Sequence, residues 1–179
     1  RDPKTKLLNF NWFMERVESY LAVEQRVRWC SVGVVDITSF KRYNDTFGHA
    51  VGDRIIERVA RILSDQIRSD DILALERGTE ARDLHARFGG DEFAVLLHNC
   101  EPENALQVAN GLLKTVDEFE FIWGSNKFTL GVSVGLVAID SRFKRITQVM
   151  NAADSACYAA KDAGRNRVAT YQEDTQLLE

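Results

Sequence analysis

The sequence predicts an α+β fold in which helices pack against a central, mostly antiparallel sheet. Segments with apolar residues at helical spacing alternate along the chain with short apolar runs typical of buried strands. Two of the short runs are joined by the tight-turn sequence Gly124-Ser125-Asn126, which favours antiparallel pairing. With 179 residues, 45% of them hydrophobic, the chain is long enough to form one domain with a sizeable core.

Four segments are predicted to be helices because their apolar residues recur every three or four positions. They are residues 12–21, 55–63, 105–116 and 149–160. We expect their apolar faces, with Trp12 and Tyr20 in the first, to lie in the core. The last helix should end at Gly164, because glycine readily adopts the left-handed conformation of a helix cap.

Six segments are predicted to be strands because they are short, apolar and bounded by turn-forming residues. They are residues 29–36, 84–88, 92–98, 119–123, 128–138 and 166–171. The turn at residues 124–126 should join the fourth strand to the fifth. The order of the strands in the sheet does not follow from the pattern alone.

Charge and cysteine content exclude several functional classes. The formal net charge is −4 without a long basic run, which argues against a nucleic-acid surface, since such surfaces need clustered Lys and Arg. Cys30, Cys100 and Cys157 lie far apart and indicate core or surface thiols in a reducing compartment. The histidines form no metal-ligand pair, so zinc is not implied.

The ends of the sequence indicate one domain cut from a longer protein. The chain opens with Arg1-Asp2-Pro3, without an initiator methionine, a signal peptide or a membrane-spanning stretch. We expect a cytoplasmic domain that does not itself insert into a membrane. Any sensor or membrane anchor would lie outside this segment.

The most informative motif is Arg87-Phe88-Gly89-Gly90-Asp91-Glu92-Phe93, followed by an apolar run. The two glycines permit a tight left-handed turn, which would place Asp91 and Glu92 at the tip of a hairpin. Carboxylates on a rigid turn beside a strand end suit metal-ion chemistry. Taken alone, the same motif also fits a turn followed by two solvated acids.

A second acid, Asp36, follows the buried strand predicted at residues 29–36. An acid at the end of an apolar strand lies at a sheet edge, where open sheets commonly hold ligands. We therefore expect Asp36 and Asp91 to meet across one cleft.

With both acidic segments in view, the chain resembles the GGDEF family of diguanylate cyclases, which join two GTP molecules into cyclic di-GMP and release two pyrophosphates. The resemblance runs from Asp2-Pro3-Lys4-Thr5-Lys6-Leu7-Leu8-Asn9 to Lys161-Asp162-Ala163-Gly164-Arg165-Asn166-Arg167. It implies a palm-like sheet shared with nucleotidyl cyclases and polymerases. The domain would span residues 1–171, with residues 172–179 starting a linker or C-terminal extension.

The resemblance implies that Asp36, the backbone carbonyl of Ile37 and Asp91 hold the metal ions, Mg²⁺ or alternatively Mn²⁺. Glu92 matches an acid credited either with metal binding or with activating the attacking hydroxyl. Without such a role, Glu92 would be a surface acid that stabilises the hairpin.

Phosphate contacts are expected in two places. Backbone N–H groups around Ser39, Phe40 and Lys41 could form an anion-binding nest, which by resemblance cradles the β- and γ-phosphates. Lys161 and Arg165 are spaced to share one face of a helix near its C-terminus, where cations usually just complement the helix dipole. Their match to the family's Lys-x-x-Gly-Arg element favours phosphate contact.

By resemblance, Asn44 and Asp53 recognise guanine, with His49 close by. A carboxylate can accept hydrogen bonds from guanine N1–H and the 2-amino group. Asn44 and Asp53 otherwise fit a turn former and a first-turn helix acid. Gly89 and Gly90 are also expected to contact the substrate.

One site of this kind holds one GTP, so the resemblance implies a homodimer, at least transiently, with two domains facing each other. A sensor domain upstream would be the natural controller, and a phosphodiesterase domain is a further candidate for fusion. The competing hypothesis is a non-catalytic regulatory domain that binds GTP or cyclic di-GMP.

The chain departs from the family pattern at an inhibitory product site, an Arg-x-x-Asp element. The usual spacing selects Asp83 but puts Glu80 where arginine is expected. An alternative match uses Arg68 and Asp71, with an insertion at residues 75–86. Product inhibition is therefore doubtful.

Two further departures lie near the start of the chain. Lys4 replaces a common leucine, and Phe10 stands where the family usually has arginine. We expect these changes to affect packing and regulation before chemistry.

Overall fold

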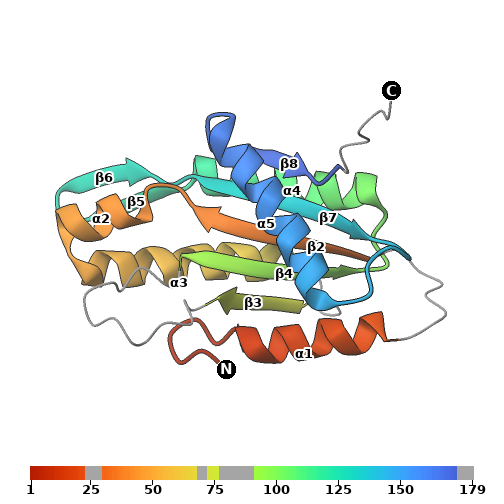
Figure 1. The fold of residues 1–179 in the computed structure, drawn as a ribbon. Coiled ribbons are helices and arrows are strands. Elements are labelled where there is room, and N and C mark those ends of the chain that lie inside the picture. Colours follow the sequence, from red (N-terminus) through yellow and green to blue (C-terminus); the bar gives the residue numbers. More distant parts are fainter. Residues whose placement is uncertain (23–29, 68–71, 77–90, 173–179) are drawn as a thin grey trace.

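The computed structural model describes residues 1–22, 30–67, 72–76 and 91–172. Within these ranges the fold is α+β, as the sequence predicts, with a six-stranded sheet and helices on both faces (Figure 1). The sheet order is β1-β3-β4-β2-β7-β8. The strands are β1 Leu8–Asn9, β2 Cys30–Ile37, β3 Ile72–Glu76, β4 Glu92–His98, β7 Val132–Ile139 and β8 Val168–Thr170.

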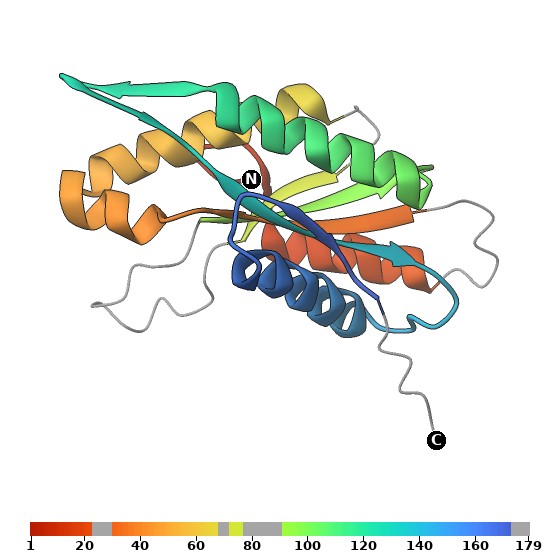
Figure 2. The same cartoon turned by 90° about the horizontal axis from the view of Figure 1, so that it is seen from above.

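The centre of the sheet is antiparallel and both of its outer pairs are parallel. Strand β2 lies between β4 and β7 and runs antiparallel to each, and β3 is antiparallel to β4. The short strands β1 and β8 pair in parallel with β3 and β7. A separate two-stranded hairpin is formed by β5 (Glu120–Trp123) and β6 (Asn126–Thr129), and it projects from the body (Figure 2).

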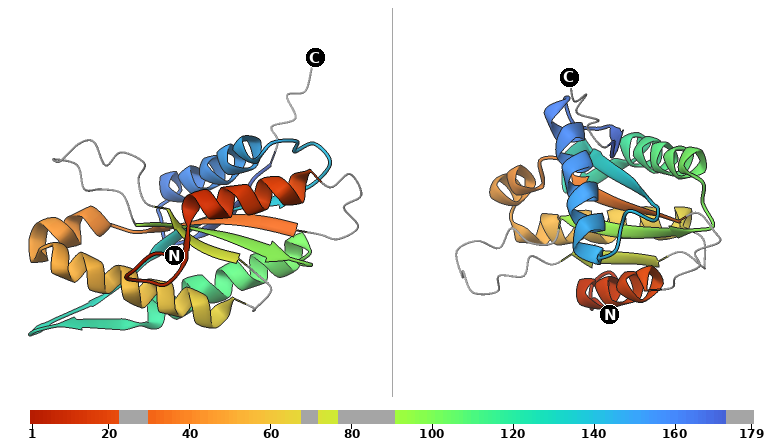
Figure 3. Two further views of the ribbon diagram at one scale, coloured as in Figure 1. Left: turned by 90° about the horizontal axis from the view of Figure 1, so that it is seen from below. Right: turned by 45° about the vertical axis from the view of Figure 1, so that its right-hand side comes forward.

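Helices cover both faces of the sheet, and for this reason the central strands are almost continuously apolar. Figure 2 and the left view of Figure 3 show α1 and α5 on one face and α3 and α4 on the other. Two core clusters correspond to these faces, with Val32 and Val34 on the α1/α5 side and Val35 and Ile37 on the α3/α4 side. The helices are α1 Phe10–Leu21, α2 Phe40–Phe47, α3 His49–Gln66, α4 Pro102–Glu118 and α5 Ile146–Asp162.

Each of the four predicted helices is present, and so is the cap at Gly164, which has a φ of 123°. One expectation for α1 is wrong, because Trp12 is 49% exposed. Only Phe13, Val17 and Leu21 of α1 are buried, since residues four apart share one helical face. The Arg16 guanidinium lies over the Trp12 ring, 5.1 Å from its centroid.

The predicted strands at residues 29–36 and 92–98 are confirmed within one residue. The predicted strand at 128–138 is instead two strands, β6 and β7, because the chain leaves the hairpin at Leu130 and Gly131 before it enters the central sheet. The predicted strand at 84–88 lies outside the described residues. Strands β1 and β3 and helix α2 were not predicted.

No helix in the described ranges is both long and apolar enough to cross a membrane.

Candidate functional site

The structure places three acids at one end of the central strands. Asp36, near the end of β2, lies opposite Glu92 of β4 in the antiparallel register. The Ile37 N–H donates to the Asp91 carbonyl at 3.0 Å, which extends the pairing by one residue beyond β4. Asp36 and Asp91, which the sequence analysis expected to meet, are therefore neighbours at this end of the central strands.

The Asp91 carboxyl is electrostatically perturbed. Burial, and next the negative charge of Asp36, raise the pKa of Asp91 from 3.8 to about 6. A hydrogen bond between the two carboxyl groups raises the Asp91 pKa further, whereas Lys161 lowers it. Two acids that resist ionising together are typical of a site that binds a cation or handles protons.

Lys161 brings a positive charge from α5 to the same cluster. Its ammonium forms an ion pair with Asp36 Oδ2, and the Asp36 side chain is only 14% exposed. Burial by itself would lower the Lys161 pKa. The hydrogen bond to Asp36 and the negative charge of Asp36 outweigh burial, so the Lys161 pKa is raised. Lys161 therefore carries its charge over the whole physiological pH range.

The end of α5 is fixed by a Schellman cap. The Gly164 N–H donates to the Lys161 carbonyl at 3.2 Å, and the Arg165 N–H donates to the Ala160 carbonyl at 3.0 Å. The expectation that Lys161 and Arg165 share a helical face is therefore wrong, because α5 ends at Asp162. Arg165 follows Gly164 in a left-handed conformation with a φ of 62°, and its side chain is exposed.

The segment after Asp36 turns sharply into a helix. Ser39 has a left-handed φ of 58°, and α2 begins at the next residue, Phe40, which is buried in the core. The predicted turn around Ser39, Phe40 and Lys41 is thus the N-terminus of an eight-residue helix. Backbone N–H groups in such a turn can point at an anion, as the predicted nest requires.

The two candidate guanine-binding residues lie on adjacent helices. Asn44 on α2 is 8% exposed, and its Oδ1 is buried without a hydrogen-bond partner in the part of the chain that is described. This oxygen lies against Gly52 of α3, where a Cβ would come within 1.8 Å of it. Asp53 is the next residue, and His49 is the exposed first residue of α3.

Asp53 has a partner that sequence reasoning missed. Lys4 Nζ lies 2.5 Å from Asp53 Oδ2, and both side chains are nearly half exposed. The only sequence signal was that Lys4 departs from the family's leucine. A pair separated by this many residues depends on tertiary packing, which no local pattern records.

A pocket of about 360 Å³ between α2 and the β5–β6 hairpin was also not predicted. Tyr43 and Phe47 of α2 stack on Phe128 of β6 beside it, with ring centroids 4.9 and 5.5 Å apart. Ser39 lines this pocket as well as the turn described above, whereas Asp36 and Asp91 do not line it.

Several predicted site residues lie outside the described residues. They are Gly89, Gly90, Arg68, Asp71 and Asp83. Contacts of the two glycines with substrate and the inhibitory product site therefore stay predictions. Glu76 of β3 lies opposite Glu92 of β4, so the proposed insertion at residues 75–86 starts within a strand.

Asp36 and Asp91 could hold a divalent metal ion that completes its coordination with a phosphate ligand. Among the residues described, no three His, Cys, Asp or Glu side chains come together as a metal site. Mg²⁺ is commonly bound by one or two carboxylates, with phosphate oxygens and waters completing its octahedron. Asp36 and Asp91 supply that number of carboxylates, and Lys161 pairs with Asp36 in the same cluster.

Comparison with known families gives a match over nearly the whole chain. The family model described as "Diguanylate cyclase, GGDEF domain" matches residues 1–80 and 73–167. Probable diguanylate cyclase DgcE from Escherichia coli K12 is 37% identical over 138 residues, which is 77% of this chain and 11% of that protein. Diguanylate cyclase A from Treponema denticola is 32% identical, over 92% of this chain and 41% of the relative. This chain thus spans less than half the length of each of these relatives.

Solved structures share the fold. The GGDEF domain of DgcB from Caulobacter crescentus, solved with c-di-GMP, has a TM-score of 0.83 and 27% identity, covering 96% of this chain and 92% of that chain. Diguanylate cyclase SiaD from Pseudomonas aeruginosa, solved with its activator SiaC, has a TM-score of 0.82 and 28% identity. That match covers 95% of this chain and 61% of SiaD.

Proposed function

Because the chain belongs to the GGDEF family of diguanylate cyclases, we propose that it condenses two GTP molecules into cyclic di-GMP and releases two pyrophosphates. The observation that carries this proposal is the pair of carboxylates at one end of the central strands, Asp36 and Asp91, with the Lys161 ammonium on Asp36. Joining a 3′-hydroxyl to an α-phosphate needs a deprotonated oxygen and neutralised phosphate charge. Two acids beside a fixed cation are suited to both tasks.

Asp36, Asp91 and the Ile37 carbonyl oxygen would hold Mg²⁺, with Mn²⁺ as the alternative. When bound, the ion would neutralise phosphate charge and lower the pKa of the attacking hydroxyl. Glu92, opposite Asp36 in the sheet, would either add a ligand or accept the hydroxyl proton.

The phosphates would be held from two sides. The backbone N–H groups of Ser39, Phe40 and Lys41, at the start of α2, bind the β- and γ-phosphates. Lys161 and the exposed Arg165 add positive charge from the end of α5. A fixed set of donors and cations on the phosphates is the main protein contribution in phosphoryl transfer.

The guanine base would lie at the junction of α2 and α3. The unpartnered Oδ1 of Asn44 indicates a missing polar partner, since buried polar atoms are normally hydrogen-bonded. Asp53, half exposed beside it, accepts from guanine N1–H and the 2-amino group. His49 begins α3, about one helical turn before Asp53.

Cyclic di-GMP synthesis requires two copies of this domain, each with one GTP, facing each other as a homodimer. We assign the domain to residues 1–171, with residues 172–179 leading into a linker or extension. The relatives are much longer than this chain, in keeping with fusion to sensor domains and, as a further candidate, a phosphodiesterase domain.

The direct test is GTP turnover with Mg²⁺ across a range of protein concentrations, with nucleotide products separated by chromatography. We expect cyclic di-GMP to increase more steeply than linearly with protein concentration, because two copies must meet. Asp91→Asn should abolish the product. Asp65→Asn makes the same chemical change at an exposed position of α3 and should leave turnover intact.

A chain that makes no cyclic di-GMP even when it is forced to dimerise would refute catalysis. Measured binding of GTP or cyclic di-GMP without turnover would then support the regulatory alternative.

A further inference from the structure

We propose that Lys4 is a guanine specificity-determining residue, whose ammonium stays on Asp53 and donates a hydrogen bond to guanine O6. The inference rests on the proposed function, because it assumes that Asp53 receives the guanine base. It assigns a role to a residue at which this chain departs from its family, where leucine is common.

The structure fixes the backbone of Lys4 firmly. The Asp2 carboxylate accepts hydrogen bonds from the Lys4 N–H at 3.0 Å and from the Thr5 N–H at 2.8 Å. The Asp2 N–H donates to the Leu7 carbonyl at 2.7 Å, and Leu7 is buried in the core cluster that includes α3. This turn lies beside α3 (Figure 3, left), so the Lys4 side chain reaches Asp53 from a backbone position that is held in place.

The ammonium of Lys4 has donors to spare. It lies 2.5 Å from Asp53 Oδ2, its only ion-pair partner in the described ranges. A lysine ammonium carries three N–H donors. The Lys4 and Asp53 side chains are 46% and 45% exposed, so a ligand can reach the pair without opening the core.

The arrangement matches the edge of guanine. A carboxylate that accepts from N1–H and the 2-amino group has guanine O6 at its flank, because O6 is bonded to the carbon next to N1. An ammonium held on that carboxylate is then within reach of O6, and the flexible lysine stem can adjust to it. The result is a charge-assisted hydrogen bond, which is stronger than a neutral one.

The Lys4 ammonium also disfavours binding of adenine. Adenine carries an amino group at C6, which is a donor, in place of the O6 acceptor. Its N1 has no hydrogen to offer Asp53. Lys4 and Asp53, the two members of one ion pair, therefore both favour guanine. Asn44 borders this site, because its side chain lies against Gly52, the residue next to Asp53.

The test measures binding by calorimetry, with Mg²⁺, of three nucleotides that lack the attacking hydroxyl: 3′-deoxy-GTP, its 6-thio derivative and 3′-deoxy-ATP. The variant is Lys4→Met, which keeps the chain length and removes the charge. The control is Lys6→Met, the same change two residues away at an exposed lysine with no ion pair in the described part of the chain.

We expect the unmodified chain to prefer 3′-deoxy-GTP over its 6-thio derivative, because sulfur is a weaker acceptor than O6. Lys4→Met should weaken 3′-deoxy-GTP binding about ten-fold and remove that preference, whereas Lys6→Met should retain both. In the Lys4→Met variant, the ratio of 3′-deoxy-GTP affinity to 3′-deoxy-ATP affinity should also decrease.

The proposal would be overturned if the Lys4→Met variant bound 3′-deoxy-GTP at least as tightly as the unmodified chain does and still preferred it over the 6-thio derivative. Lys4 would then only shield Asp53. An unmodified chain that binds no guanine nucleotide would instead overturn the proposed function together with this inference.

Discussion

Gly135 of β7 marks the place where α5 lies closest to the sheet, and a methyl group there should strongly destabilise the domain. A Cβ on Gly135 would lie 2.2 Å from the Cys157 backbone nitrogen and 2.3 Å from the Ala153 carbonyl oxygen. Both atoms belong to the backbone of α5 and cannot rotate away. The helix would have to move by about 1 Å or more to restore ordinary van der Waals separation.

The cost of Gly135→Ala follows from this rigidity. Overpacking a core costs about 1–3 kcal/mol, and we expect a loss near 3 kcal/mol because no side chain can absorb the overlap. Moving α5 also moves Lys161 away from Asp36, so the charge cluster at the end of the central strands should be disturbed. The free energy of unfolding, obtained from urea titrations that compare midpoint and slope, measures the loss.

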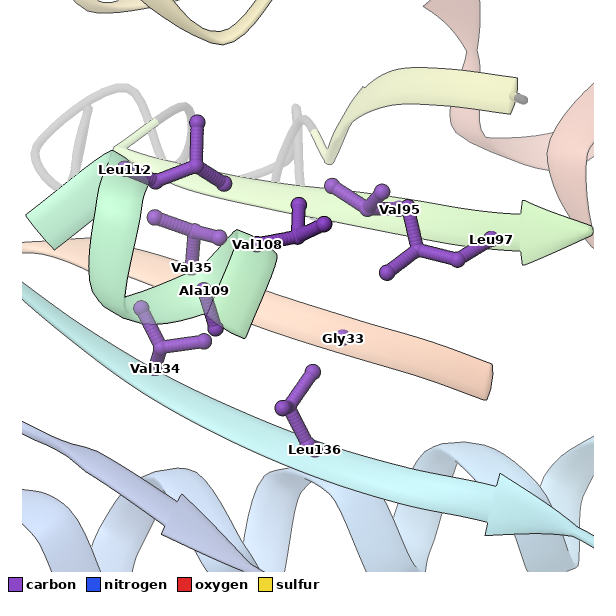
Figure 4. Close-up of a pocket in the computed structure, with 9 residues that line it drawn as sticks. All are labelled: Gly33, Val35, Val95, Leu97, Val108, Ala109, Leu112, Val134 and Leu136. Atoms are coloured by element: carbon purple, nitrogen blue, oxygen red, sulfur yellow. The ribbon is translucent and has the colours of Figure 1, made fainter. Parts of the chain in front are cut away.

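Gly33→Ala is the matched control, on the adjacent strand β2. Its new Cβ would lie 3.0 Å from Leu136 Cδ2, the end of a flexible side chain. Gly33 and Leu136 line a small apolar cavity of about 10 Å³ beneath α4, into which the methyl and leucine can adjust (Figure 4). We expect stabilisation by about 0.5–1 kcal/mol, from lost chain entropy and added apolar burial.

We therefore expect the surroundings of each glycine, not the residue type, to decide the sign of the change in unfolding free energy. Equal effects of the two glycine substitutions on unfolding free energy would refute it. A loss below about 1 kcal/mol for Gly135→Ala would show that α5 is not held against the strand by its backbone.

Three further predictions concern the site. The Asp91 pKa is raised from 3.8 to about 6, so its stabilising contribution is fully present below pH 3.8 and is lost as the pH rises through 6. Asp91→Asn should therefore raise the melting temperature at pH 7.5 and do so much less at pH 4; an equal shift at both values would contradict this. Mg²⁺ with 3′-deoxy-GTP should raise the melting temperature of the unmodified chain but not of Asp91→Asn, since a ligand stabilises only the state that binds it. Gly52→Ala should weaken GTP binding by displacing the Asn44 side chain. The free energy of unfolding should change by less than about 1 kcal/mol, because alanine favours the helix. Unchanged GTP affinity would argue against the guanine site.

Local patterns were sufficient for the long elements. Helices α3, α4 and α5 each bury one apolar face over four or more turns, which makes their spacing unambiguous. Strands β2 and β4 are continuous apolar runs because helices cover both faces of the sheet. Gly164 could be predicted because a helix cap with positive φ strongly favours glycine.

The missed elements depend on distant contacts. Strand β3 has five residues, and its pairing with β4 is set by tertiary structure and not by its own composition. Helix α2 contains Asn44-Asp45, which indicates a turn in isolation, yet burial of Phe40 and stacking of Tyr43 on Phe128 support a helix.

The candidate site shows the same division. The sequence pattern located Asp36 at a strand end and Asp91 in a turn beside a strand, and the family resemblance supplied their roles. Neither indicated that Lys161 pairs with Asp36 or Lys4 with Asp53, since each pair joins segments that meet only after folding. The shared helical face of Lys161 and Arg165 was wrong because the cap at Gly164 ends the helix between them.

The short outer strands have a consequence for solubility and assembly. Strand β1 has two residues and β8 has three, so the outermost strand on each side of the main sheet offers few backbone groups of its own to another chain. Long bare edges recruit strands from other copies and lead to aggregates. A domain whose proposed reaction requires repeated encounters between copies benefits from such edges, because the copies can then meet through side-chain surfaces and separate again once the product has formed.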